Sequence, residues 1–192
     1  MLVIDPSTEL AAVNTIIYLI GESPVNSLTA TTNVDVINAR TLLQQESRKV
    51  QDKGWTFNID EAGVLTPDAF SGQIVWKPTW LRVVSEGGTP YVNRGGLVYD
   101  RLAKENTFAG PLSVTLIEEV PFDELPYCFQ TLATVRAARR FNANSFGAPE
   151  VDAEAARLEA EAVVACNEYE LDYGDYNLFT GDAYVAGQLT RS

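Results

Sequence analysis

The segment DYGDYNLFTGD, residues 172–182, combines carboxylates, aromatic rings and glycines over a short length of chain. Such residues could coordinate a cation, stack against a sugar ring, or contact another protein. An EF-hand calcium loop starting at Asp175 would need an oxygen ligand at its fifth position and glycine at its sixth, where the sequence has Phe179 and Thr180. We therefore expect no metal or other cofactor, and we interpret the segment as a docking surface. Its interface candidates are Tyr173, Tyr176 and Phe179.

Carboxylates elsewhere in the chain could serve a glycoside hydrolase, which needs only one acid and one nucleophile or base. Neighbouring side chains on a strand point to opposite faces of the sheet, so an adjacent acidic pair in a strand does not make such a dyad. Histidine is absent, which removes the most common general base and metal ligand. We expect no enzyme and no catalytic residues, and a carboxylate-based glycoside hydrolase and a carbohydrate-binding module are the alternatives. The adjacent acidic pairs are Asp60–Glu61, Glu118–Glu119 and Asp123–Glu124.

Charge is distributed unevenly along the chain. The net charge is −12, and residues 150–182 hold ten acidic side chains against Arg157 alone. Residues 125–149 hold no acidic residue and three arginines, whose spacing places them on one face of a helix. We expect these arginines to complement the helix dipole and to meet an acidic partner, either the next helix of the same chain or another copy. The charged interface candidates are Arg136, Arg139 and Arg140 on one side and Glu161 and Glu168 on the other.

Helical periodicity occurs at both ends of the chain, and short strand-like runs lie between them. Apolar stripes predict a first helix from Pro6 to Gly21, capped by Asp5, and a second helix from Asn33 to Lys53. Two more helices are predicted over residues 121–141 and 150–173. The expected fold class is α+β: a helix bundle of residues 1–54 and 122–173, an inserted small antiparallel β subdomain of residues 55–121, and a C-terminal interface tail of residues 174–192.

The expected β subdomain is rich in aromatic and β-branched residues punctuated by Gly and Pro. Its predicted strands are the runs WTFNI, QIVWK, WLRVV, PYVN, LVYD and LSVTLIE. The stretch YVNRGGLVYDR contains an Arg-Gly-Gly triplet that could suggest nucleic-acid binding. A single copy between two strand-like runs predicts instead a hairpin whose turn uses Gly95 and Gly96.

The remaining features concern compartment and partners. Cys128 and Cys166 fall on predicted helices, and we interpret them as core residues and not as a disulfide. The start MLVIDPSTEL has no basic segment or long apolar core, so we expect no signal peptide, and no apolar run is long enough to span a membrane. Binding to a phosphate backbone depends on clustered Lys and Arg, and we therefore do not expect a chain this acidic to bind DNA over a broad face.

Several distinctive strings occur together and in a fixed order. They are DVINARTLLQQESRKVQDKGWTFNIDE, TPDAFSG, YVNRGGLVYDR, PFDELPYCF, FNANSFGAPEVD and EYELDYGDYNLF. From about Leu10 to the C-terminus the chain closely resembles the tail tubular protein A family of short-tailed bacteriophages. Lys53 departs from that family's frequent Arg before Gly-Trp, which is a mild change.

The resemblance implies a structural component of the virion tail, made in the host cytoplasm and not inserted in a membrane. Family members form a ring, typically of twelve copies, between the portal protein and the nozzle made of tail tubular protein B. They also help to seat the tail fibre, and double-stranded DNA passes through the lumen without specific binding. A glycoside hydrolase acting on bacterial envelope or capsular sugars is the alternative, as a second activity of such a tail protein.

A closed ring requires two different complementary patches on each subunit. The basic end of the third predicted helix and the acidic fourth helix are a possible pair of patches. Neutralising Arg136, Arg139 and Arg140 should then weaken ring formation while the monomer stays folded.

Overall fold

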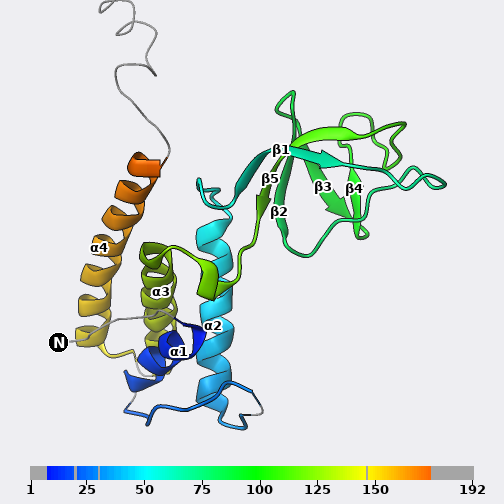
Figure 1. The fold of residues 1–192 in the computed structure, drawn as a ribbon. Coiled ribbons are helices and arrows are strands. Elements are labelled where there is room, and N and C mark those ends of the chain that lie inside the picture. The colour runs from blue at the N-terminus through cyan, green and yellow to red at the C-terminus, as the bar shows by residue number, and fades with distance from the viewer. Residues whose placement is uncertain (1–7, 20, 30, 146, 174–192) are drawn as a thin grey trace, which may run out of the picture.

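The computed structural model describes residues 8–19, 21–29, 31–145 and 147–173. Within these residues it contains four α-helices and one five-stranded sheet, with α2, α3 and α4 lying alongside one another, the short α1 crossing them, and the sheet projecting beyond the end of α2 (Figure 1). The expected α+β class, with an antiparallel sheet between two pairs of helices, is confirmed. The expected tail, residues 174–192, lies outside the described residues, and the subdomain boundaries stay a prediction.

Helix α1 spans Glu9–Tyr18 and begins later than expected. Thr8 has an extended backbone, and its side chain accepts a hydrogen bond from the Ala11 N–H at 3.1 Å, so Thr8 is the cap. The expected cap at Asp5 is therefore wrong, and Asp5 itself lies outside the described residues. The apolar stripe is confirmed, because Val13, Ile16 and Ile17 are fully buried.

Helix α2 spans Val34–Gln51, and the Asn33 side chain accepts hydrogen bonds from the first turn. Two of its apolar residues, Val34 and Ile37, are exposed. The buried face is rotated away from them, and in its second half it contains polar side chains. The buried residues of α2 are Val36, Ala39, Leu42, Leu43, Glu46, Ser47, Val50 and Gln51.

The strands are β1 (Ile59–Leu65), β2 (Trp80–Ser85), β3 (Pro90–Arg94), β4 (Leu97–Tyr99) and β5 (Leu112–Glu118), in the spatial order β1-β5-β2-β3-β4. Neighbouring strands pair antiparallel. The turn between β3 and β4 is confirmed at Gly95 and Gly96, whose φ angles of 64° and 80° suit glycine.

Two expected strands are corrected by the structure. Residues 55–58 form a turn, because the Asn58 side chain accepts a hydrogen bond from the Trp55 N–H at 2.8 Å, and β1 begins only at Ile59. The run QIVWK contributes a single bridge, between Val75 and Leu97, at the edge of the sheet.

Helix α3 spans Tyr127–Ser145 and is preceded by a short 3-10 turn, Phe122–Glu124. The expected continuous helix from residue 121 is interrupted because Leu125 precedes Pro126 and is extended, with ψ of 146°. Helix α4 spans Pro149–Tyr173, a length of 25 residues, as the periodicity predicted. It packs against α3, which lies between α4 and α2 (Figure 1).

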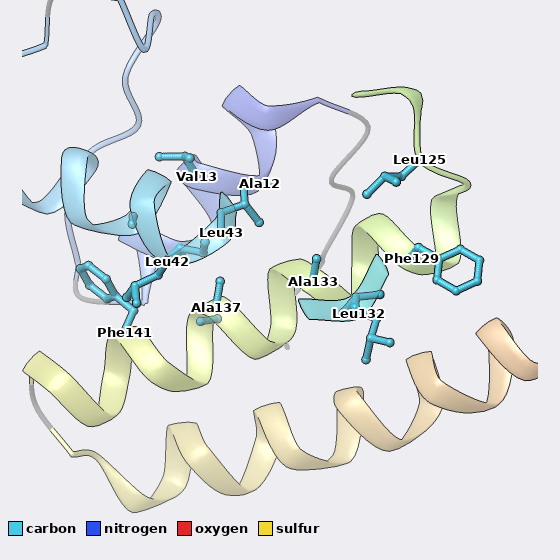
Figure 2. Packing of buried hydrophobic residues seen from close by; sticks show 14 of the residues in the cluster. Ala12, Val13, Leu42, Leu43, Leu125, Phe129, Leu132, Ala133, Ala137 and Phe141 are labelled. Carbon is cyan, nitrogen blue, oxygen red and sulfur yellow. The ribbon is translucent and has the colours of Figure 1, made fainter. Parts of the chain in front are cut away.

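Buried apolar side chains form two separate clusters. The larger joins the four helices, and Figure 2 shows Ala133, Ala137 and Phe141 along the side of α3 that faces Val13 of α1 and Leu42 of α2. The smaller lies within the sheet. The helices and the sheet therefore each have a core of their own. The sheet cluster consists of Leu65, Ile74, Trp80, Val83, Val98, Val114 and Leu116.

Candidate assembly interface

The three arginines of α3 are all paired with acidic side chains of their own chain. Arg136 and Arg139 both contact Glu159 of α4, at 2.9 and 2.7 Å, and Arg139 also contacts Asp152 at 3.0 Å. Arg140 contacts Glu46 of α2 at 2.5 Å. Arg136 and Arg139 thus contact the next helix of the same chain, which was one of the two expected partners, whereas Arg140 contacts the earlier helix α2.

Glu46 is the most buried carboxylate in this network, with 6% of its side chain exposed. Burial opposes its ionisation, but hydrogen bonds from Lys49 and Arg140 outweigh that effect and hold its pKa below the ordinary value. Burial likewise opposes ionisation of Glu159, and the hydrogen bonds from Arg139 and Arg136 lower its pKa. These charges therefore join α2, α3 and α4 inside one subunit.

The acidic interface candidates lie on the outer side of α4. Glu161 is exposed and forms an ion pair with Arg157 of the same helix. Glu168 is exposed and has no basic partner in the described part of the chain. Tyr173 is 68% exposed at the end of α4 and stacks on Tyr169, with ring centroids 4.4 Å apart. Tyr176 and Phe179 lie outside the described residues.

Helix α4 also carries exposed apolar residues that the sequence analysis did not select. Val164 is 56% exposed and Leu171 is 63% exposed. Each lies nine residues after a buried alanine of the same helix, Ala155 or Ala162, which is two and a half turns. The two exposed residues are therefore on the side opposite the packed stripe. Searching α4 for a second apolar stripe would have found them.

A trough runs along α3 between α2 and α4. It contains two adjoining hollows of about 440 and 180 Å³, and Lys49 and Arg136 line both. Lys53 lines the smaller hollow, and its Nζ lies 4.1 Å from the centre of the Trp55 ring. The walls of that hollow are otherwise mainly apolar, formed by Val50, Trp55, Leu132, Val163 and Cys166 with Asn167.

Another hollow, of about 650 Å³, lies between α2 and the chain that returns from β5. Carboxylates of Glu9, Glu119 and Asp123 line it. Glu9 binds Arg40, Glu119 binds Arg48, and Asp123 accepts the Glu9 N–H at 2.6 Å, so each is engaged by a group of the chain itself. The hollow contains one member of each of two expected acidic pairs, whereas Asp60 and Glu61 are exposed on β1.

The two cysteines are free thiols, with Cys166 buried and Cys128 half-buried. A hydrogen bond to Cys128, together with burial, raises the pKa of Cys166, so this thiol stays protonated. Cys166 is thus a core residue, as interpreted from the sequence, whereas Cys128 is only half-buried. Among the described residues, no group of three metal-binding side chains occurs, and no helix is long and apolar enough to cross a membrane.

The carboxylates that line these hollows are bound by groups of the chain itself, and the longest described helix leaves a second apolar face exposed. The model of the tail tubular protein family matches residues 10–176. The chain belongs to that family, as its distinctive strings predicted, and is a structural component of a phage tail. Tail tubular protein A of Klebsiella phage KP34 is 30% identical over 120 residues, which are 62% of this chain and 62% of that relative. The match thus spans less than two thirds of the relative's length.

Proposed function

We propose that the chain is the subunit of an adaptor ring that joins the portal of the capsid to the nozzle of the tail. The observation that supports this role best is the family match over most of the chain. The exposed face of α4 adds to it, because a helix with apolar residues on two opposite sides buries the second side only against another molecule. The ring provides that second molecule.

The proposed ring also forms part of the channel through which the genome leaves the capsid. The chain carries a net charge of −12, and a negatively charged wall repels phosphate groups. Duplex DNA then slides past without specific binding, since retention on protein requires clustered Lys and Arg. All five arginines of α2 and α3 are paired with carboxylates, which leaves fewer free cations to hold a phosphate.

The proposed partners are further copies of the chain, the portal protein, the nozzle protein and the tail fibre. We assign Tyr173 and the segment that follows it to one of these contacts. Tyr173 is exposed at the end of α4 and stacks on Tyr169, so an aromatic surface lies at that end of the helix. We assign Tyr176 and Phe179 of the following segment to the same contact.

Co-expression with the portal and nozzle proteins of the same phage tests this function. Electron microscopy should show a ring of this chain with a central opening, bound to the portal on one side and the nozzle on the other. A variant carrying Tyr176→Ala and Phe179→Ala should keep the melting temperature of the wild type and lose one of the partners. Failure of the wild type to bind either the portal or the nozzle would overturn the proposed function.

A further inference from the structure

We propose that two particular surfaces form the contact between neighbouring copies in this ring: the outer face of α4 of one copy and the trough of the next. The inference rests on the proposed ring, and it identifies the surfaces that close it. The outer face of α4 is defined by Glu161, Val164, Glu168 and Leu171. The trough is the one between α2 and α4, lined by Lys49, Lys53 and Arg136.

The outer face of α4 has the pattern of a helix that docks in a groove. Its residues Glu161, Val164, Glu168 and Leu171 follow one another at intervals of three and four, which keeps them on one side of the helix. All four are exposed. The apolar side chains would supply buried area in the contact, and the carboxylates beside them would supply charge.

The trough matches this face in charge. Five cations line its two hollows against three carboxylates, so its balance is positive on a chain that is strongly negative overall. The arginines are engaged by Glu46, Asp152 and Glu159, whereas Lys53 has no carboxylate within 4.0 Å among the residues that the structure describes. Lys49 is 59% exposed although it contacts Glu46. The lysines are thus the cations that an incoming Glu168 would meet.

The trough also matches this face in shape and polarity. The smaller hollow, of about 180 Å³, has apolar walls and is large enough for one aliphatic side chain such as Leu171. Its cations stand beside these walls. An apolar residue can therefore enter the hollow while a neighbouring carboxylate on the same helix reaches Lys53.

The contact is directional, because the face and the trough are different surfaces of the same chain. Such heterologous contacts generate a ring when the rotation between copies closes, and a filament when it does not. Duplex DNA is the competing occupant of a cationic trough. The apolar hollow and the unpartnered Val164 and Leu171 favour a second copy, since neither feature has a counterpart in a phosphate backbone.

A charge exchange tests the contact. Glu168→Lys alone and Lys53→Glu alone should each weaken self-association at least tenfold, measured by sedimentation or native mass spectrometry, because each places like charges opposite one another. The double variant restores an opposite-charge pair and should recover most of the association. Glu86→Lys and Lys104→Glu, which exchange exposed charges in the β region, are the matched controls and should assemble as the wild type does.

The outcomes separate this inference from the proposed function. Rings that form equally well with Glu168→Lys and with Lys53→Glu would overturn the assigned contact and leave the adaptor ring in place. A wild type that does not self-associate, alone or with the portal, would remove both. Retention of duplex DNA by the wild type and its loss in Lys53→Glu would assign the trough to phosphate and overturn the inference. Leu171→Gln, which changes no charge, should also weaken association and checks the apolar part of the contact.

Discussion

Replacing Gln51 by leucine should destabilise the fold more than the same change at an exposed position of α2. Gln51 is fully buried near the end of α2, and its side-chain amide binds the backbone of Val120, where the chain returns from the sheet. It accepts from the Val120 N–H at 2.7 Å and donates to the Val120 carbonyl at 3.0 Å. A third bond, at 3.1 Å, is donated by the same amide to the Ser47 hydroxyl.

The expected cost follows from the groups left without a partner. Leucine has nearly the volume of glutamine, so the loss of packing is small and the loss of hydrogen bonds dominates. A buried donor or acceptor without a partner costs about 1–3 kcal/mol. Two such groups on half-buried Val120, with part of the cost offset by burial of the leucine, give about 2–4 kcal/mol. For a domain of this size, that lowers the melting temperature by roughly 2–4 °C per kcal/mol.

Urea denaturation followed by tryptophan fluorescence measures the change. Asn14 provides a matched control, because its amide binds the N–H and the carbonyl of Val25 in the same manner, at 2.8 and 2.9 Å, but is itself only partly buried, whereas Gln51 is fully buried. Water replaces those bonds in Asn14→Leu, so its cost should be about 1 kcal/mol. Equal losses of unfolding free energy in the two variants would refute the argument that burial makes the Gln51 hydrogen bonds costly to remove.

Three further results are expected. The free energy of unfolding should fall as pH drops below about 5, because Glu46 and Glu159 have folded-state pKa values below the ordinary 4.5 and their contribution is lost on protonation. In Glu159→Gln, the free energy of unfolding measured in urea should depend less on pH in that range. Gly54→Ala should cost about 1–3 kcal/mol in thermal unfolding, because φ is 81° and the new Cβ would lie 2.7 Å from Ile117 Cδ1. Arg139→Met should lower the melting temperature of the isolated protein, since the two carboxylates that Arg139 contacts are in the same chain. An unchanged melting temperature with weakened ring formation would favour a contact of Arg139 between copies instead.

Periodicity predicted the long helices and the hairpin well, for a local reason. The stripe of α4 repeats regularly over 25 residues, and its buried members include Ala155, Ala162 and Cys166. The hairpin depends on two adjacent glycines with positive φ, which is a property of a few neighbouring residues. Both features depend on residues close together in the chain, so they can be predicted from the sequence.

The exposure of Val34 and Ile37 on α2 has a different cause, because the buried face of that helix is set by groups far along the chain. It passes through Glu46 and Gln51, whose partners, the Arg140 side chain and the Val120 backbone, lie 94 and 69 residues away. A polar residue on a buried face makes the apolar stripe less regular, so the stripe read from the sequence points away from the true buried face. No local pattern in α2 contains that information.

The same reasoning applies to the proposed assembly surface, because α4 has apolar residues on two opposite sides and the sequence does not tell which side is buried in the subunit. Alanines and a cysteine occupy the side of α4 that packs on α3, whereas Val164 and Leu171, which are larger, face outward. Small residues let two helices approach closely inside the subunit, and large apolar residues left outside contribute buried area only when a second molecule covers them. The side chains most valuable for assembly are therefore those that a monomer leaves exposed, and the structure of one copy is required to tell the two faces apart.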